Sequence, residues 1–290
     1  MNIIGITFAL LALFSWGFGD FLIQKTARKF GDWITLFYIT AFGSIIIFPF
    51  ITEDLSVLVG SGNGLFVLLA ASCLILFGAL FEFEAFRVGR LSAIEPILAL
   101  EVPVTVGLAT YVIREHLGLT QTILIIALIL GVVLVSIKSF HHLKSISLEA
   151  GVLYAGLATI AMGFVNFLFA IGSRATSPLL INWFTSIFIA IVALIYLAST
   201  KQLGQITGDW KKNKHLILGV GFVDNLAWVA YSYSTTYIPI AIATSVSEAY
   251  IAFAAILGVV LNKETLRAHQ VFGIVLAVVS VIALSAITAQ

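Results

Sequence analysis

The sequence predicts an all-α polytopic membrane protein with ten transmembrane helices in two inverted five-helix repeats. Of its 290 residues, 61% are hydrophobic and only 10% are charged, and the mean hydropathy is +1.12. A soluble fold of this size needs far more charge to cover its surface. Ten apolar runs approach the roughly 20 residues that a helix needs to cross a bilayer, and motifs of the first half return in the second.

The ten runs follow one another with short connections. We expect them at residues 3–24, 32–51, 64–86, 92–113, 120–138, 149–172, 178–198, 214–236, 240–261 and 269–288. They are apolar all round, whereas the strands of a membrane barrel alternate. The longest connection, 199–213, is predicted to be a solvated turn. The first run lacks the basic flank and cleavage site of a signal peptide, so we expect it to be retained.

Two pairs of segments indicate an internal duplication. The stretch around Gly17 returns 146 positions later around Gly163, which pairs Asp20 with Asn166. The stretch 114–121 returns 149 positions later, which pairs Glu115 with Glu264. Five spans per half is an odd number, so the halves are expected to cross the membrane in opposite directions, with the substrate between them. We therefore divide this single membrane domain into repeats at residues 1–144 and 145–290.

The lysines and arginines predict the orientation. All but two of the 15 lie in connections after odd-numbered spans, and the exceptions are Arg114 and Arg174. The positive-inside rule then places the odd connections in the cytoplasm and both termini outside the cytoplasmic (plasma) membrane. The net charge is only +1 and no basic block is present, so nucleic acid is not an expected partner. The lone Cys73 cannot form an internal disulfide.

Several of these residues resemble a known family. The pair Trp16-Gly17, the run 94–103 and the glutamates Glu115 and Glu264 are similar to EamA-type members of the drug/metabolite transporter superfamily. The resemblance covers essentially the whole chain and implies a transporter of small metabolites. It also implies cytoplasmic termini, opposite to the charge count, and a lysine where this chain has Gln24. Residues 222–231 are similar to a choline-transporting branch, which makes an organic cation a reasonable substrate.

Acids inside spans are the strongest candidates for function, because a carboxylate costs at least ~2.5 kcal/mol to insert near the middle of a bilayer. Each could instead be neutral, or bonded to a neighbouring helix, and only hold the bundle together. Seven acids in such positions are too many for that role alone, so some should line a path accessible to water. They are Asp20, Glu82, Glu84, Glu95, Glu101, Asp224 and Glu248.

Helical spacing places two of these acids beside aromatic residues. Asp20 shares a face with Trp16, and Asp224 shares a face with Trp228 and Tyr231. An acid next to a ring suits a cation, although such rings more often serve packing. The predicted substrate-binding residues are Trp16, Asp20, Glu82, Asn166, Asp224, Trp228, Tyr231, Ser247 and Glu248.

Neighbouring acids are expected to have different roles. Glu82 and Glu84 are about 200° apart around a helix and cannot face one cavity together. Glu84 precedes Arg87 by three residues, which favours an intrahelical ion pair and leaves Glu82 for the cavity. Glu95 precedes Pro96 at the start of a span, where a carboxylate stabilises the amino end of a helix.

Glu101 and Glu248 are the candidates for proton coupling. Glu101 lies two residues before Pro103, whose missing N–H frees the carbonyl of Ala99, and a broken helix beside an acid is typical of an ion site. Glu248 follows the hydroxyl-rich stretch 244–247, whose side chains could bond a ligand or only the backbone. Burial disfavours the charged form of a carboxylate and so promotes proton exchange near neutral pH.

Together these patterns predict a secondary active transporter that moves a small cationic or zwitterionic metabolite by alternating access, coupled to protons. The alternatives are an exporter of amino acids or other metabolites and, from another class, a channel or membrane scaffold. No enzymatic activity, metal or cofactor is expected, because all five histidines lie in connections or at the very start of a span and no phosphate-binding Gly-Lys-Ser/Thr loop is present. The expected partners are the substrate, protons and lipid, with the chain a monomer or weak homodimer.

Overall fold

A computed structural model describes residues 2–55, 62–88, 97–137, 150–262 and 265–289. Within these ranges the chain is helical and contains no strand, which confirms the predicted all-α class. The elements are α1 (Asn2–Phe30), α2 (Asp32–Ile47), the 3-10 turn η1 (Phe48–Phe50), α4 (Gly62–Val88), α6 (Glu101–Tyr111), α7 (Leu119–Ser136), α9 (Ala150–Ala175), α10 (Pro178–Ser199), α11 (Leu203–Tyr237), α12 (Ile240–Glu248), α13 (Tyr250–Asn262) and α14 (Ala268–Ala289).

Nine segments of the described chain are long and apolar enough to cross a membrane, and each corresponds to one predicted run. The one remaining run, 92–113, is different. Its first five residues lie outside the described ranges, and a turn at residues 99–100 precedes α6, which has only 11 residues. The chain is therefore an integral membrane protein with nine such helices in its described part and a shorter helical segment at the fourth predicted span.

One connection was predicted wrongly. Residues 203–212 are helical and belong to α11, whereas the sequence predicted a solvated turn over 199–213. The backbone departs from helical geometry only at Asn213 (φ −133°, ψ 25°). Tertiary contacts stabilise this segment, because Tyr38 donates a hydrogen bond to the carbonyl of Ile206 at 2.6 Å. The two glycines that suggested a turn lie on the exposed side of this helix.

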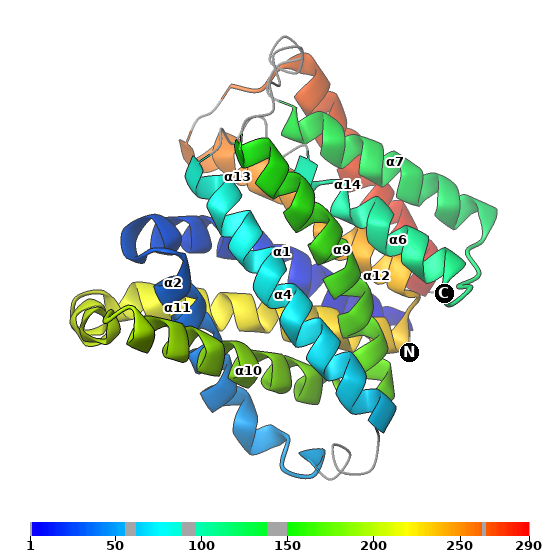
Figure 1. The fold of residues 1–290 in the computed structure, drawn as a ribbon. Helices are drawn as coiled ribbons and strands as arrows, with labels where there is room; N and C mark the ends of the chain where they lie inside the picture. Colours follow the sequence, from blue (N-terminus) through cyan, green and yellow to red (C-terminus); the bar gives the residue numbers. More distant parts are fainter. Residues whose placement is uncertain (1, 56–61, 89–96, 138–149, 263–264, 290) are drawn as a thin grey trace.

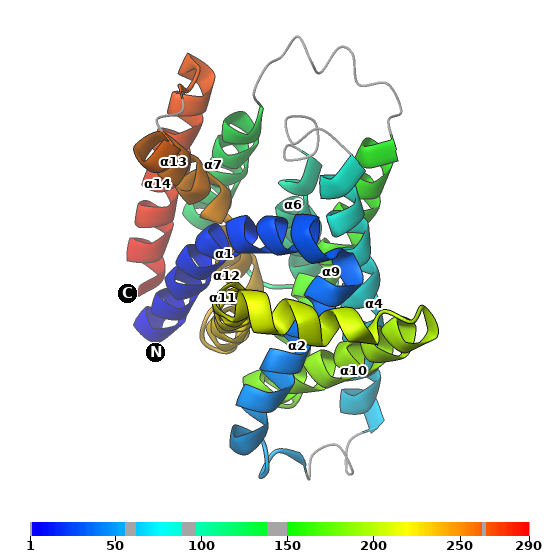
Figure 2. The same ribbon diagram turned by 90° about the vertical axis from the view of Figure 1, so that its left-hand side faces the viewer.

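The helices pack as antiparallel pairs. Figure 1 shows α4 beside α9 and α7 beside α14, and Figure 2 shows the two ends of the chain near each other. On α2, Trp33 near the start stacks on Tyr196 near the end of α10, with ring centroids 4.0 Å apart. On α7, a Cβ at Gly131 would lie 2.7 Å from the backbone nitrogen of Ala277, so the absence of a side chain lets α14 approach this closely.

Two breaks occur at matching positions of the two repeats. Leu100 (φ −79°, ψ 0°) precedes α6, and Ala249 (φ −65°, ψ 0°) separates α12 from α13. These residues are 149 positions apart, the spacing of the repeat at this point of the sequence. Pro103 explains the first break, because it cannot donate to the carbonyl of Ala99. No proline occupies the matching position of the second repeat, where Ala252 stands.

Candidate functional site

A cavity of about 120 Å³ lies where the two breaks meet the long helices. This volume has room for several waters or a small organic molecule. Side chains from both repeats line it: Trp16, Ile23, Leu36, Ile39, Thr40, Ile75, Ala79, Glu82, Phe83, Glu101, Met162, Asn166, Phe169, Asn182, Thr185, Ser186, Ile189, Asp224, Asn225, Trp228, Glu248 and Tyr250.

The polar part of the lining is acidic. Four carboxylates, those of Glu82, Glu101, Asp224 and Glu248, face the cavity, and within the described ranges its lining contains no Lys, Arg or His. Glu248 is 3% exposed, and its Oε1 accepts a hydrogen bond from Asn166 Nδ2 at 3.2 Å. Carboxylates that face a cavity with no basic residue in its described lining produce a negative potential that attracts cations.

Aromatic rings form another part of the wall. Trp228 contacts Trp16 edge-to-face with ring centroids 5.2 Å apart, and Phe169 lies 4.6 Å from Trp228. Tyr250 lies 6.2 Å from Trp16. These rings hold one another in place, so the faces that they present to the cavity are preorganised for an apolar or cationic group.

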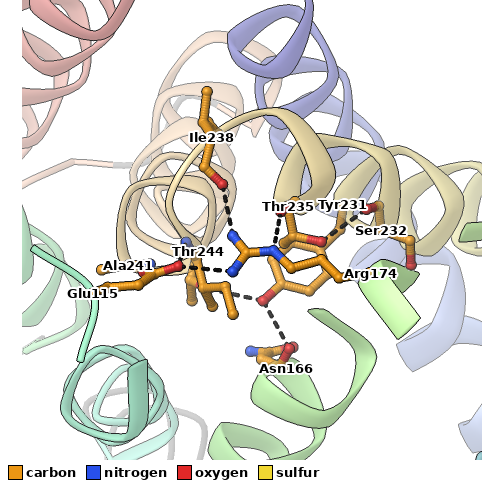
Figure 3. Close-up of polar contacts among 10 residues, drawn as sticks. Glu115, Asn166, Arg174, Tyr231, Ser232, Thr235, Ile238, Ala241 and Thr244 are labelled. Atoms are coloured by element: carbon orange, nitrogen blue, oxygen red, sulfur yellow. Dashed lines mark hydrogen bonds and ion pairs between the residues drawn. The ribbon is translucent and has the colours of Figure 1, made fainter. Parts of the chain in front are cut away.

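Tyr231 lies directly behind this wall and ties three helices together. Its hydroxyl is 3.0 Å from the carbonyl oxygen of Asn166 on α9 and 2.8 Å from Thr244 Oγ1 on α12 (Figure 3). The side chain is completely buried and does not line the cavity. Tyr231 therefore supports the backbone around Asn166 and the middle of α12.

The structure brings most of the predicted site residues together. The cavity contains Trp16, Glu82, Glu101, Asn166, Asp224, Trp228 and Glu248. Two others, Tyr231 and Ser247, do not line it, and Ser247 donates to the carbonyl of Thr244 at 3.1 Å. The side chain of Asp20 and the whole of Glu95, Glu264 and the neighbouring histidines His141 and His142 lie outside what the structure describes.

The predicted separation of Glu82 from Glu84 agrees with the geometry. Glu84 forms the intrahelical ion pair with Arg87 at 2.7 Å, which confirms that prediction. Glu82 lines the cavity instead. A group of three or more possible metal ligands is absent from the described residues.

Sequence reasoning missed the polar residues of α10. Asn182, Thr185 and Ser186 all line the cavity, and Asn182 Nδ2 donates to Ser232 Oγ at 2.8 Å and to the carbonyl of Pro178 at 2.7 Å. With Ile189 they occupy positions i, i+3, i+4 and i+7, so helical spacing was a usable signal. Because uncharged polar residues are tolerated in spans, they attract less attention than acids. Thr40, Asn225 and Tyr250 were missed for the same reason.

The lining is built from equivalent positions of the two repeats. Eight residues from residues 1–144 have their partner, 146 or 149 positions later, in the same wall. The pairs are Trp16 with Met162, Ile23 with Phe169, Leu36 with Asn182, Ile39 with Thr185, Thr40 with Ser186, Ile75 with Asp224, Ala79 with Trp228, and Glu101 with Tyr250. Equivalent positions of the two repeats therefore face the same cavity.

Comparisons with known proteins agree with this arrangement. A family model described as "EamA-like transporter family" matches twice, at residues 3–137 and 149–286. Among solved structures 29 chains match. One, titled "Crystal structure of protein", has a TM-score of 0.70 at 11% identity and covers 99% of each chain, which shows a shared fold. No curated protein sequence matches significantly.

Proposed function

Because the chain belongs to the EamA-like transporter family of the drug/metabolite transporter superfamily, we propose that it carries a small organic cation or zwitterion across the membrane by alternating access. Family membership indicates a transporter rather than an enzyme, with a small-molecule substrate and the lipid bilayer as its surroundings. The remaining choices concern the charge of the substrate, the topology and the driving force.

The observation that carries the cationic substrate is the chemistry of the cavity wall. It offers four carboxylates, and the Asn182 and Asn225 amides each donate both hydrogens to protein acceptors. Neither amide has a hydrogen left for an anionic group. An amine or quaternary ammonium would meet carboxylates and the faces of Trp16 and Trp228, an arrangement that favours binding by roughly 0.5–2 kcal/mol per ring.

An exporter of amino acids is the second candidate. Its substrate would also carry an ammonium group, which the same carboxylates suit. The substrate carboxylate, however, would lie among like charges, which lowers affinity. A choline-like or simple amine substrate is therefore preferred over an amino acid.

We propose that the two repeats are inverted, with the boundary at residues 144 and 145. The helices that correspond in the repeat alignment, α2 with α10 and α7 with α14, run antiparallel. A two-fold axis in the membrane plane reverses corresponding helices, whereas an axis along the membrane normal leaves them parallel. The matching breaks at Leu100 and Ala249 support the same symmetry. The charge count supports termini outside the cytoplasm.

Proton coupling is proposed through Glu101 or Glu248. Both line the cavity next to a break, so substrate and proton would compete for the same carboxylate. Flux of the substrate should then depend on pH, and Glu101→Gln or Glu248→Gln should remove that dependence. A flux that is independent of pH in the unchanged protein would contradict coupling.

The experiment that tests the substrate is a thermal-shift screen of the purified protein with quaternary amines, primary amines and amino acids. A ligand at 100 times its dissociation constant stabilises by about 2.7 kcal/mol. We expect choline-like amines to raise the melting temperature, and Glu248→Gln to weaken their binding by about 100-fold because a buried charge pair is lost. Asp224→Asn should act in the same direction.

Glu84→Gln is the matched control, because it removes a carboxylate from the same fold outside the cavity. Its affinity for amines should equal that of the unchanged protein. Stabilisation by amino acids alone, or equal binding in Glu248→Gln, Asp224→Asn and Glu84→Gln, would overturn the cationic substrate.

A further inference from the structure

An ion pair closes one end of the bundle. Arg174, the second-last residue of α9, binds Glu115 with Nη1 and Oε1 3.1 Å apart. Its Nε donates to the carbonyl of Thr235 at 2.7 Å and its Nη2 to the carbonyl of Ile238 at 3.1 Å (Figure 3). One guanidinium thus bonds a carbonyl in the last turn of α11 and the carbonyl of the residue that follows the helix, and the last carbonyls of a helix have no partner within it.

Glu115 binds the amino end of the next helix, α12. Its Oε1 accepts from the backbone nitrogen of Ile240 at 2.8 Å, and its Oε2 from that of Ala241 at 3.1 Å. A carboxylate at this position satisfies the free amides and opposes the positive end of the helix dipole. Glu115 lies outside the helices, in the segment between α6 and α7, and its own amide donates to the carbonyl of Ala109. The pair therefore joins the end of α9 to the α6–α7 and α11–α12 connections.

A sealed layer separates this pair from the cavity. Tyr231, Ser232 and Thr235 on α11 and Thr244 and Ser245 on α12 are all completely buried. These five side chains, on the segments of α11 and α12 that lead from the ion pair to the cavity, have no surface exposed to solvent. A path to this face requires the two helices to separate.

Helix α12 connects the pair to the cavity. It has nine residues, which span about 13 Å. Its first two amides bind Glu115, and its last residue is Glu248, which lines the cavity. In its middle, Thr244 bonds Tyr231, whose hydroxyl also bonds Asn166, the donor to Glu248. A displacement of α12 would therefore change both its contacts with Glu115 and the position of Glu248 in the cavity wall.

We propose that Glu115 and Arg174 form the lock of a gate at the α11–α12 connection, which holds the cavity closed on this face and must release when it opens there. The inference rests on the proposed transport function. Both are positioning residues, since neither touches the cavity. The Glu115 side chain is only 11% exposed, so water weakens the pair less than a surface pair.

The test is thiol labelling with a membrane-impermeant methanethiosulfonate, in a Cys73→Ser background that removes the one native cysteine. Ser245→Cys reports on the sealed layer. Arg174→Met should increase its labelling rate about tenfold, as expected when the closed state loses a charge-assisted hydrogen bond. Arg174→Lys keeps the charge beside Glu115 and should increase the rate less. Glu115→Gln should resemble Arg174→Met.

Two controls separate gate opening from general loosening. Ser136→Cys on α7 is a matched reporter, because both serines are buried and donate to the carbonyl four residues earlier. Its rate should not change in the lock variants. Glu84→Gln breaks an ion pair elsewhere in the fold and should leave Ser245→Cys unaffected.

An unchanged rate at Ser245→Cys in Arg174→Met, or equal acceleration at Ser136→Cys, would overturn the gate. Labelling requires no substrate, so it is independent of the proposed cationic cargo. If the labelling rates were unchanged while choline stabilised the protein, only the gate would be disproved. If the lock variants accelerated labelling while no amine bound, only the proposal of a cationic substrate would be disproved.

Discussion

Helices α2 and α10 occupy equivalent places in the two repeats but present different chemistry to the cavity. Leu36 and Ile39 on α2 correspond to Asn182 and Thr185 on α10. The same contrast appears between α4 and α11, where Ile75 stands opposite Asp224 in the alignment. The duplication preserved the positions that face the cavity and changed the residues in them.

This difference separates two requirements of the site. A pseudo-symmetric scaffold provides a hollow between two similar halves, which alternating access uses. A substrate such as choline has two different ends, so its binding needs an asymmetric wall. We infer that its polar part faces Asn182 and Thr185 of α10 and Asp224 of α11, and that its apolar part faces Leu36 and Ile39 of α2 and Ile75 of α4. Variants in which a cavity residue is replaced by its equivalent from the other repeat test this inference directly.

The largest effect is expected from Trp228→Ala, which copies Ala79 of the first repeat. The change removes ring contacts with Trp16 and Phe169 and one face of the cation site. We expect about 100-fold weaker binding of quaternary amines, measured by titration, because both preorganisation and the cation–π contact are lost. Trp228→Phe keeps an aromatic ring at this position and should lose much less affinity for quaternary amines.

Trp183→Ala is the control for that prediction. Trp183 is on α10, packs on Phe48 and does not line the cavity. It should lower the melting temperature without changing amine affinity. Equal affinity in Trp228→Ala and Trp183→Ala would show that the aromatic wall does not bind the substrate.

A smaller effect is expected from Asn182→Leu, which copies Leu36. It replaces an amide by an apolar group and removes the hydrogen bond that Ser232 accepts. Affinity for polar amines should fall about tenfold, the usual cost of one lost polar contact. The reverse variant, Leu36→Asn, adds an amide to the opposite wall and should not compensate for it. Recovery of affinity in the double variant would mean that the two walls are interchangeable.

The smallest effect is expected where the repeats already agree. Thr40 and Ser186 are equivalent, both buried to the same extent, and both carry a hydroxyl. Exchanging them, as Thr40→Ser with Ser186→Thr, should change transport less than about twofold, since only one methyl group moves. A tenfold loss would show that the position of this methyl group, and therefore shape, decides specificity.

The sequence was most informative about features that extend over a whole membrane-spanning segment. Long apolar runs predicted the helices, and helical spacing predicted that Glu82 and Trp228 would occupy cavity positions. It failed for 203–212, because contacts such as the one from Tyr38 stabilise a helix that its glycines disfavour. It also failed for Asn182, because a single amide in an apolar run has no distinctive pattern.

By itself the sequence determined an all-helical membrane protein that is built from a duplicated unit, because hydropathy and repetition are properties of the chain and need no contacts. The tertiary structure alone decided which polar groups share a cavity. Tyr231 and Asp224 are on the same helix, yet only Asp224 faces the hollow, while Tyr231 packs between α9 and α12. The rotation of each helix depends on the neighbours against which it packs, and those neighbours are distant in sequence.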